Sequence, residues 1–334
     1  EFSFKKMLNV GKSAMITANA NILFMLFLGY YTGLLLGWST TDSFFLGSMI
    51  SMSSTTIIIK AFDDLNIKKQ KFTDLVFGVL VIEDLVGILL LVLLPMVALG
   101  QSINGGELAL STFKLLSFLI LCFVIGIYIV PTVLKKLTSF LNDEMLLLIT
   151  VGMCFGMVWL ATASGFSSAL GAFLMGSVLS ETGLIVRIEN VVRPLKDFFG
   201  AVFFVSVGMM VDPAMFVTYA GPIAVVTLIV VVGKVVFSCF GFVISGQSLR
   251  TSTECAFSLA QVGEFAFIIA ALGMSLGVLD GQVYPVIVAV SVITTFLTPV
   301  MIRSAGPVYR LIERKLPASW SRYINKASAA RAPS

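Results

Sequence analysis

The chain has 334 residues, of which 58% are apolar and only 12% are charged, and its mean hydropathy is +1.02. Soluble globular domains carry about twice that share of charged residues. The composition therefore excludes a soluble enzyme or binding domain and indicates a polytopic membrane protein.

Apolar stretches of the length needed to cross a bilayer, about 20 residues, recur along the chain. We predict ten membrane-spanning helices, at residues 14–37, 43–62, 74–98, 111–134, 143–163, 167–184, 198–211, 219–244, 253–276 and 282–303. The seventh, at about 14 residues, is short for a crossing.

The basic residues fall on one side of this predicted topology. With both ends of the chain inside, the inner segments hold 20 of the 22 Lys and Arg residues, an outer loop holds Lys114, and Lys234 lies within a span. Short cytoplasmic loops are enriched in this way. We therefore predict a cell (inner) membrane protein with both ends of this chain cytoplasmic, and we predict that the seventh segment crosses. The net charge of +4 then indicates contact with anionic lipid and not with nucleic acid.

Four charged residues lie in the middle of apolar spans: Glu83, Asp84, Lys234 and Glu264. Charge at this depth is costly and usually marks an ion or proton pathway. Together with Ser53, these residues lie near the centres of their spans, within about 5 Å of the midplane at the rise of an α-helix. We predict an ion site there, and we expect Gly87 to leave space beside the two adjacent acids.

The second and ninth spans have the composition of interrupted helices. The second carries consecutive hydroxyl side chains, which compete with the backbone for hydrogen bonds, at Ser51, Ser53, Ser54, Thr55 and Thr56. The ninth contains the polar, glycine-containing segment Ala260-Gln261-Val262-Gly263-Glu264. Broken helices supply carbonyl groups and helix ends to ion sites in transporters. The candidate accessory ligands are therefore Ser53, Ser54, Thr55, Gln261 and Glu264.

The two interrupted spans occupy comparable places in two groups of three, spans one to three and spans eight to ten. These groups run in opposite directions in the predicted topology, as an inverted repeat requires. A purely structural role is the alternative for two features: Glu264 could neutralise a helix end, and the hydroxyl run could pack between helices.

Five segments resemble, in order and spacing over about residues 45–304, the monovalent cation:proton antiporter-2 family. They are SMSSTTIIIKAFDDLNIKKQ, FGVLVIEDLVGILLLVLLP, GFSSALGAFLMGSVLSET, RPLKDFFGAVFFVSVGMMVD and LAQVGEFAFIIA. The resemblance implies an all-α membrane protein with a sodium/proton antiporter-like fold, inverted repeats and two broken crossing helices. It also implies thirteen membrane helices, of which ten are expected here and three before Glu1.

The resemblance further implies a division into domains. We expect the two halves of a core, ion-binding domain at 1–110 and 219–304, a connecting helix at 111–138, part of a dimerisation domain at 139–218, and a basic, flexible cytoplasmic tail at 305–334. A homodimer is implied, and so is a cytoplasmic nucleotide-binding regulatory domain after residue 334.

Matched by motif, Asp84 is similar to the family's acid that binds the cation and the proton in turn. Lys234 is similar to the lysine that pairs with the carboxylate site when the cation is absent. Glu83 stands where potassium-efflux members usually have Gln and electrogenic sodium exchangers usually have Asp. The choice between Na⁺ and K⁺ and the number of charges moved therefore stay open.

The function expected from these features is secondary active transport, in which Na⁺ or K⁺ is exchanged for protons by alternating access at Asp84 and Glu83. The chain has no histidine, so proton coupling would depend on carboxylates and lysine. A cation channel and a sodium-coupled solute symporter are the alternatives. No cofactor and no enzymatic activity are expected. An intramembrane protease would need a histidine beside its serine, or two aspartates on separate helices, and Asp84 is the only aspartate in the middle of a span.

Overall fold

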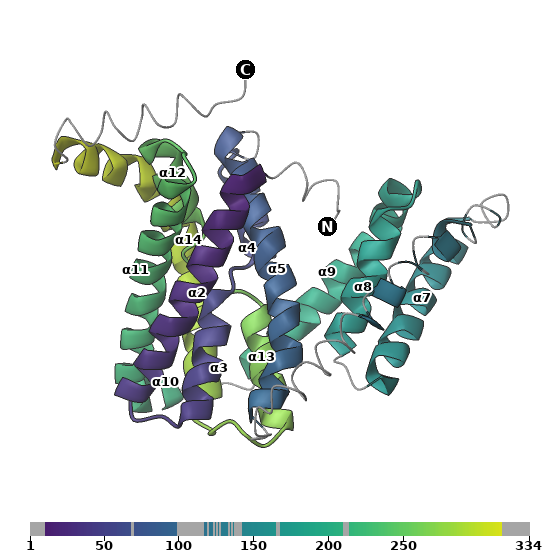
Figure 1. Cartoon of the computed structure of the whole chain (residues 1–334), viewed down its shortest axis with the longest axis horizontal. Helices are drawn as coiled ribbons and strands as arrows, with labels where there is room; N and C mark the ends of the chain where they lie inside the picture. The colour runs from purple at the N-terminus through teal and green to yellow at the C-terminus, as the bar shows by residue number, and fades with distance from the viewer. Residues whose placement is uncertain are drawn as a thin grey trace. The chain divides into compact units, whose positions relative to one another are not determined.

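The computed structural model describes residues 11–67, 70–98, 142–164, 168–209 and 214–315, with isolated helical positions between 117 and 136. These ranges are helical apart from short connections and contain no β-strand, which confirms the all-α prediction. The described residues form two compact units, one within 91–209 and one from 11–90 together with 214–315 (Figure 1). The predicted domain roles, ion binding and dimerisation, stay predictions.

The larger unit contains most of the helices. They are α2 (Gly11–Leu35), α3 (Thr40–Ser51), α4 (Thr55–Asp64), most of α5 (Lys71–Ala98), α10 (Ala214–Thr218), α11 (Ala220–Ile244), α12 (Leu249–Ser258), α13 (Phe265–Ser275) and α14 (Val283–Lys315).

Six segments of the described chain are long and apolar enough to cross a membrane, which supports the prediction of a polytopic membrane protein. They are Gly11–Leu35, Thr40–Asp64, Phe72–Pro95, Asp143–Ala163, Ala220–Ile244 and Val283–Lys315. Two shorter apolar helices are Leu170–Ser180 and Phe265–Ser275. The predicted fourth span, 111–134, lies largely outside the described residues.

Helices α2 and α11 pack against each other and run in opposite directions (Figure 1). Three contacts establish this, because residue numbers rise along α2 as they fall along α11: Ser13 with Ser245, Thr17 with Gly241, and Met25 with Gly233. These are the first helices of the two three-helix groups. Their antiparallel packing is what the predicted inversion of the two groups requires.

Both predicted interruptions are present. The second crossing is split between α3 and α4, where the Ser54 hydroxyl caps α4 by accepting a hydrogen bond from Ile57 N at 3.2 Å. The predicted ninth span is split between α12 and α13. The two breaks touch, because Gly263 N donates a hydrogen bond to Met52 O at 2.9 Å. A Cβ on Gly263 would lie 2.4 Å from Ser53 O, so only glycine allows this approach.

Two stretches expected as loops are helical. Helix α14 continues to Lys315, so residues 305–315 extend the last crossing instead of forming a flexible tail. Its last turn carries Arg314 and Lys315, and cations stabilise a helix C-terminus. Residues 316–334 lie outside the described part of the chain.

The second such stretch is α9 (Ile185–Met209), which begins well before the predicted span 198–211. Its charged first half was expected to be an inner loop. Arg193 and Glu189 form an ion pair one helical turn apart, and such pairs favour a helix. Helix α9 is not among the six segments above, so its crossing stays a prediction.

The smaller unit packs α7 (Asp143–Ala163), α8 (Ser168–Ser180) and α9 together. Helix α7 is capped by Asn142, whose Oδ1 accepts a hydrogen bond from Met145 N at 2.8 Å. Gly171 permits close packing of α8 on α7, since a Cβ there would lie 2.7 Å from Met157 O. The buried apolar core of this unit includes Val130, Leu134, Leu146, Met175, Val178, Leu179 and Ile188.

Candidate functional site

Ser53, in the break between α3 and α4, joins the polar groups of four segments. Its backbone N–H donates to Glu83 Oε2 at 2.8 Å, and its hydroxyl donates to Leu259 O at 3.2 Å. The same hydroxyl accepts a hydrogen bond from Lys234 Nζ at 2.8 Å. Ser53 therefore links both breaks to the carboxylate of α5 and to the ammonium of α11.

Glu83 is completely buried and uses both carboxylate oxygens. Oε2 accepts from Ser53 N, and Oε1 accepts from Asn21 Nδ2 of α2 at 2.8 Å. Lys234 is also completely buried, and the charge of Glu83 acts on it. Burial of either charge alone would be costly. The fold therefore holds an anion and a cation in one sealed network with Ser53 between them.

Asp84 has a different environment from its neighbour. It is partly exposed, whereas Glu83 is sealed. Successive residues of a helix point about 100° apart, so the two carboxylates leave α5 in different directions. One acid is thus a fixed part of the interior, and the other is only partly buried.

Glu264 lies where two half-helices begin. It is the N-cap residue of α13, and it accepts hydrogen bonds from the Ser54 hydroxyl and, at 3.3 Å, from Thr56 Oγ1 of α4. Negative charge is favoured at helix N-termini. The C-terminal ends of α3 and α12 lie beside Ser53 and Leu259. Positive charge is favoured at helix C-termini, and Lys234 supplies it there. The charges at the crossing therefore match the helix ends, as the structural alternative for Glu264 expects.

Several buried polar atoms near the breaks have no hydrogen-bond partner within the described residues. They are both amide atoms of Gln261, Oγ1 of Thr55 and Oδ1 of Asn21. Buried polar atoms are normally satisfied by protein, water or an ion. The backbone of the second break is partly satisfied by α14, because Val262 N donates to Thr294 Oγ1 at 3.2 Å.

One spatial prediction is wrong. Gly87 does not leave an open space beside the acid pair, because a Cβ there would lie 3.0 Å from Phe265 Cδ1 and 3.3 Å from Met52 Sδ. The ring of Phe265 and the thioether of Met52 occupy that place. Gly87 instead allows α5 to pack closely against both breaks.

The structure brings together most of the predicted site residues in two connected clusters. Ser53, Glu83 and Lys234 form one, and Ser54 and Glu264 form the other. Asn21 was missed, because the sequence gives it no signal that Asn19, two residues earlier in the same apolar span, does not share. Thr294 was also missed, because nothing in the sequence distinguishes it from Thr295 and Thr298 of the same apolar helix.

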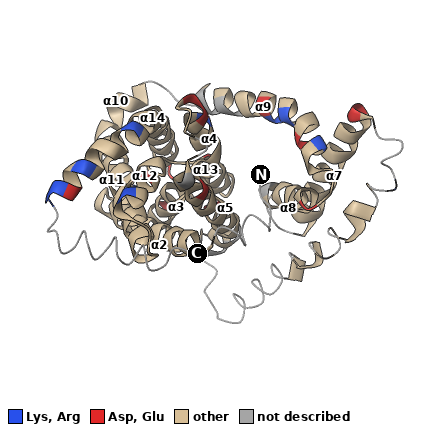
Figure 2. Ribbon diagram, turned by 90° about the horizontal axis from the view of Figure 1, so that it is seen from above, with Lys and Arg blue, Asp and Glu red and all other residues tan. Residues whose placement is uncertain are grey.

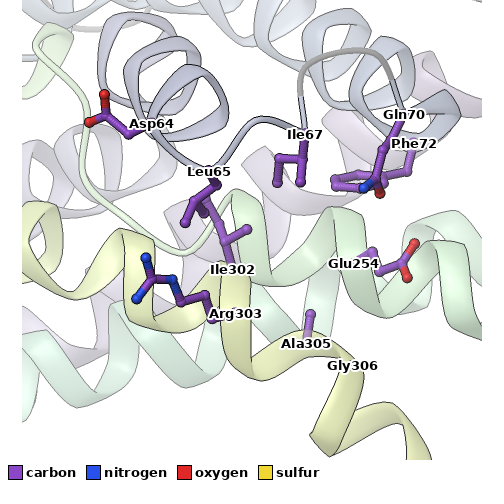
Figure 3. A pocket seen from close by; sticks show the side chains of 10 residues that line it. All are labelled: Asp64, Leu65, Ile67, Gln70, Phe72, Glu254, Ile302, Arg303, Ala305 and Gly306. Carbon is purple, nitrogen blue, oxygen red and sulfur yellow. The ribbon is translucent and has the colours of Figure 1, made fainter.

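A cavity of about 430 Å³ lies at one end of the larger unit, between α4, α12 and α14 (Figure 3). Its lining includes the carboxylates of Asp64 and Glu254, the guanidinium of Arg303, and the apolar side chains of Leu65 and Ile302. Figure 2 shows this end of the unit, with basic residues on α12 and along the C-terminal part of α14. Helix α4, about 15 Å long for its ten residues, leads from the cavity to the first break.

Comparison with known proteins gives a consistent result. The family model described as sodium/hydrogen exchanger, transmembrane, matches residues 1–305. The chain is 32% identical over 311 residues to the putative cation/proton antiporter YbaL of Escherichia coli (strain K12), covering 90% of this chain and 55% of that protein. It therefore spans little more than half of that relative's length.

Two further relatives are matched over more of their length. Identity to the K(+)/H(+) antiporter subunit KhtU of Bacillus subtilis (strain 168) is 28% over 314 residues, covering 94% of this chain and 77% of that protein. Identity to the Na(+)/H(+) antiporter of Enterococcus hirae is 26% over 293 residues, covering 87% and 76%. The predicted resemblance is confirmed.

Proposed function

The chain belongs to the transmembrane sodium/hydrogen exchanger family, and on that premise we propose that it exchanges a monovalent cation for protons. The names of the relatives support antiport. Both K⁺ and Na⁺ occur in those names, so the cargo is K⁺ or Na⁺. Transport of this kind needs no cofactor and makes no covalent bond.

The observation that carries the proposal is the sealed charge network at the meeting point of two broken helices. A carboxylate and an ammonium are both fully buried there and share Ser53. Buried charges at membrane depth are retained at a cost and mark ion pathways. Broken helices that touch at that depth are typical of secondary transporters.

In the proposed mechanism, Asp84 binds the cation and the proton in turn. A protonated Asp84 is neutral and has no free charge to hold a cation, and a cation on Asp84 displaces the proton. Since the two cannot occupy the carboxylate together, each crosses only in exchange for the other. Glu83 completes the negative charge of the site, while Lys234 balances it.

The accessory groups have proposed roles in the same site. Ser54, Thr55 and Gln261 offer hydroxyl and amide oxygens from the two breaks, and Glu264 holds the ends of the half-helices together. Alternating access would expose this site first to one side of the membrane and then to the other. The cavity between α4, α12 and α14 supports an approach route from one end of the larger unit, because its lining is polar and includes the carboxylates of Asp64 and Glu254 beside the guanidinium of Arg303.

The arrangement of the protein in the membrane is also proposed. We place it in the cell membrane with both ends of the chain cytoplasmic and with anionic lipid around the basic inner face. The smaller unit would contribute to a homodimer. A nucleotide-binding regulatory domain would follow residue 334.

Replacement of Asp84 tests the function. The complete protein is reconstituted in liposomes with a pH-sensitive dye inside, and Na⁺, K⁺ or Li⁺ is added with and without a clamped membrane voltage. We expect a cation-driven pH change that is lost in Asp84→Asn and kept in the matched control Glu144→Gln, an exposed acid of α7. A change in voltage dependence in Glu83→Gln would show that Glu83 takes part in the charge balance.

Two outcomes would contradict the proposal. Persistence of proton-coupled transport in Asp84→Asn would remove Asp84 from the mechanism. Absence of a pH change with every cation would exclude antiport and favour a channel, which passes ions without protons, or a sodium-coupled symporter.

A further inference from the structure

Asn21 lies on the buried face of α2 and is completely inaccessible. The other buried residues of this helix are mainly apolar or small: Ala14, Thr17, Ala18, Ile22, Met25, Gly29, Thr32 and Gly33. This face packs against α3 and α11. An amide in such a place is costly unless its polar atoms are bound, so its presence requires an explanation.

The hydrogen bond to Glu83 fixes the orientation of the Asn21 side chain. Nδ2 donates to Glu83 Oε1 at 2.8 Å. An ionised carboxylate only accepts, so the amide must present its NH₂ group to Glu83. The carbonyl oxygen Oδ1 is therefore the remaining atom, and it is buried without a hydrogen-bond partner among the described residues.

Oδ1 lies beside a carboxylate whose other oxygen is already engaged. Both polar atoms of an amide are attached to the same carbon, so Oδ1 stays close to Glu83 Oε1, while Oε2 is held by Ser53 N. A neutral carbonyl oxygen and a charged oxygen thus come together in a sealed region. Carbonyl oxygens can replace the hydration shell of a monovalent cation, and their number and field strength influence selectivity.

We propose that Asn21 is a ligand for the transported cation. Its carbonyl oxygen binds the dehydrated ion beside Glu83, and its NH₂ group keeps Glu83 in position. The inference rests on the proposed exchange function and deepens it, because it adds a ligand from α2, a helix that contributes neither a break nor an acid. It also assigns part of the choice between Na⁺ and K⁺ to a neutral oxygen.

The test compares cation selectivity in variants of the complete protein. Asn21→Leu keeps the branching at Cγ but has a larger side chain without a polar atom, and Asn21→Ser replaces the carbonyl oxygen with a hydroxyl oxygen on a shorter side chain. Asn19→Ala is the matched control, because Asn19 lies on the exposed side of the same helix and bonds only its own helix, at Met15 O. The KM values for Na⁺ and K⁺ are measured separately in liposomes, and the rise of Tm with each cation is measured in detergent.

We expect Asn21→Leu to raise the KM of the transported cation at least about tenfold, the usual scale for loss of a charge-assisted contact. We also expect it to abolish the cation-dependent rise in Tm. Asn21→Ser should change the ratio of the two KM values by at least about threefold, because the ratio depends on the ligand oxygen. The control Asn19→Ala should change neither the two KM values nor the cation-dependent rise in Tm.

The opposite results would overturn the inference. If Asn21 only positions Glu83, the variants bind Na⁺ and K⁺ more weakly by the same factor, and the ratio of the two KM values stays at the wild-type value. If Asn21→Leu does not fold, the ratio in Asn21→Ser decides. A wild-type protein without exchange would contradict the proposed function alone, because the cation-dependent Tm of the variants still tests Asn21 as a ligand.

Discussion

The charge on Lys234 is balanced inside the protein and not by solvent. Its ammonium is fully buried, its hydrogen bond goes to Ser53, and Ser53 in turn holds Glu83. Removal of one member of a buried charge pair leaves the other uncompensated, which is far more costly than removal of both. The two charges should therefore behave as a unit in stability as well as in transport.

We expect Lys234→Met and Glu83→Gln each to destabilise the folded protein by about 3–5 kcal/mol. The double variant should be less destabilised than the sum of the two, because it leaves no unpaired charge. Unfolding of the purified protein in detergent, followed for all four members of the cycle, measures this coupling. Additive effects would show that the two residues do not stabilise each other.

The sequence predicted site residues best where burial of the side chain in a bilayer costs the most free energy. Buried charges are rare, so the depth of Glu83, Lys234 and Glu264 predicted a shared site, and the structure connects each of them to the first break. A neutral amide is a weaker signal. Asn19 and Asn21 look alike in the sequence, but one faces outward and the other binds Glu83, and only the packing of α2 decides which.

At the level of helices, composition predicted the interruptions but not every boundary. Hydroxyl side chains and glycine weaken a helix locally, and both breaks are where these residues occur. Charge was a poor guide to loops. Residues 185–197 and 305–315 are rich in charge yet helical, because charged side chains one turn apart support a helix.

The contact between the two breaks gives a prediction for Gly263. A methyl group there would lie 2.4 Å from Ser53 O and 2.6 Å from Ser53 C, so the breaks must separate in Gly263→Ala. We expect a loss of stability of about 1–3 kcal/mol, the usual cost of overpacking, and at least about a tenfold loss of exchange. Gly281→Ala is the control, because a Cβ at Gly281 has open space. Normal exchange in Gly263→Ala would mean that close contact of the breaks is not required.

For the whole molecule, the opposite directions of α2 and α11 were predictable because hydropathy and the distribution of basic residues define the direction of each span. The cavity between α4, α12 and α14 was not predictable. It is formed by residues far apart in the sequence, such as Asp64, Glu254 and Arg303, whose proximity depends on how the two triplets pack. Single-sequence patterns carry no information on such contacts.

The direction of α14 gives a prediction about which face of the larger unit meets which side of the membrane. From Val283 to Arg303 the helix rises about 30 Å, which equals the hydrocarbon thickness. The connection before it is tied to the start of α3, because Asp280 N donates to Asp42 Oδ1 at 2.9 Å. Asp280 and Arg303 therefore lie on opposite faces, and the bias of basic residues assigns Arg303 to the cytoplasm.

In a cysteine-free background, we expect Asp280→Cys to react with a membrane-impermeant thiol reagent in intact cells. Arg303→Cys should react only after the membrane is opened, and both variants should retain exchange as the control for correct folding. Labelling of Arg303→Cys in intact cells would reverse the orientation, and with it the side from which cations enter the cavity. Labelling of both variants in intact cells would contradict the crossing of α14 itself. Both ends of the helix would then lie outside the cell, although the helix is long enough to span the hydrocarbon layer.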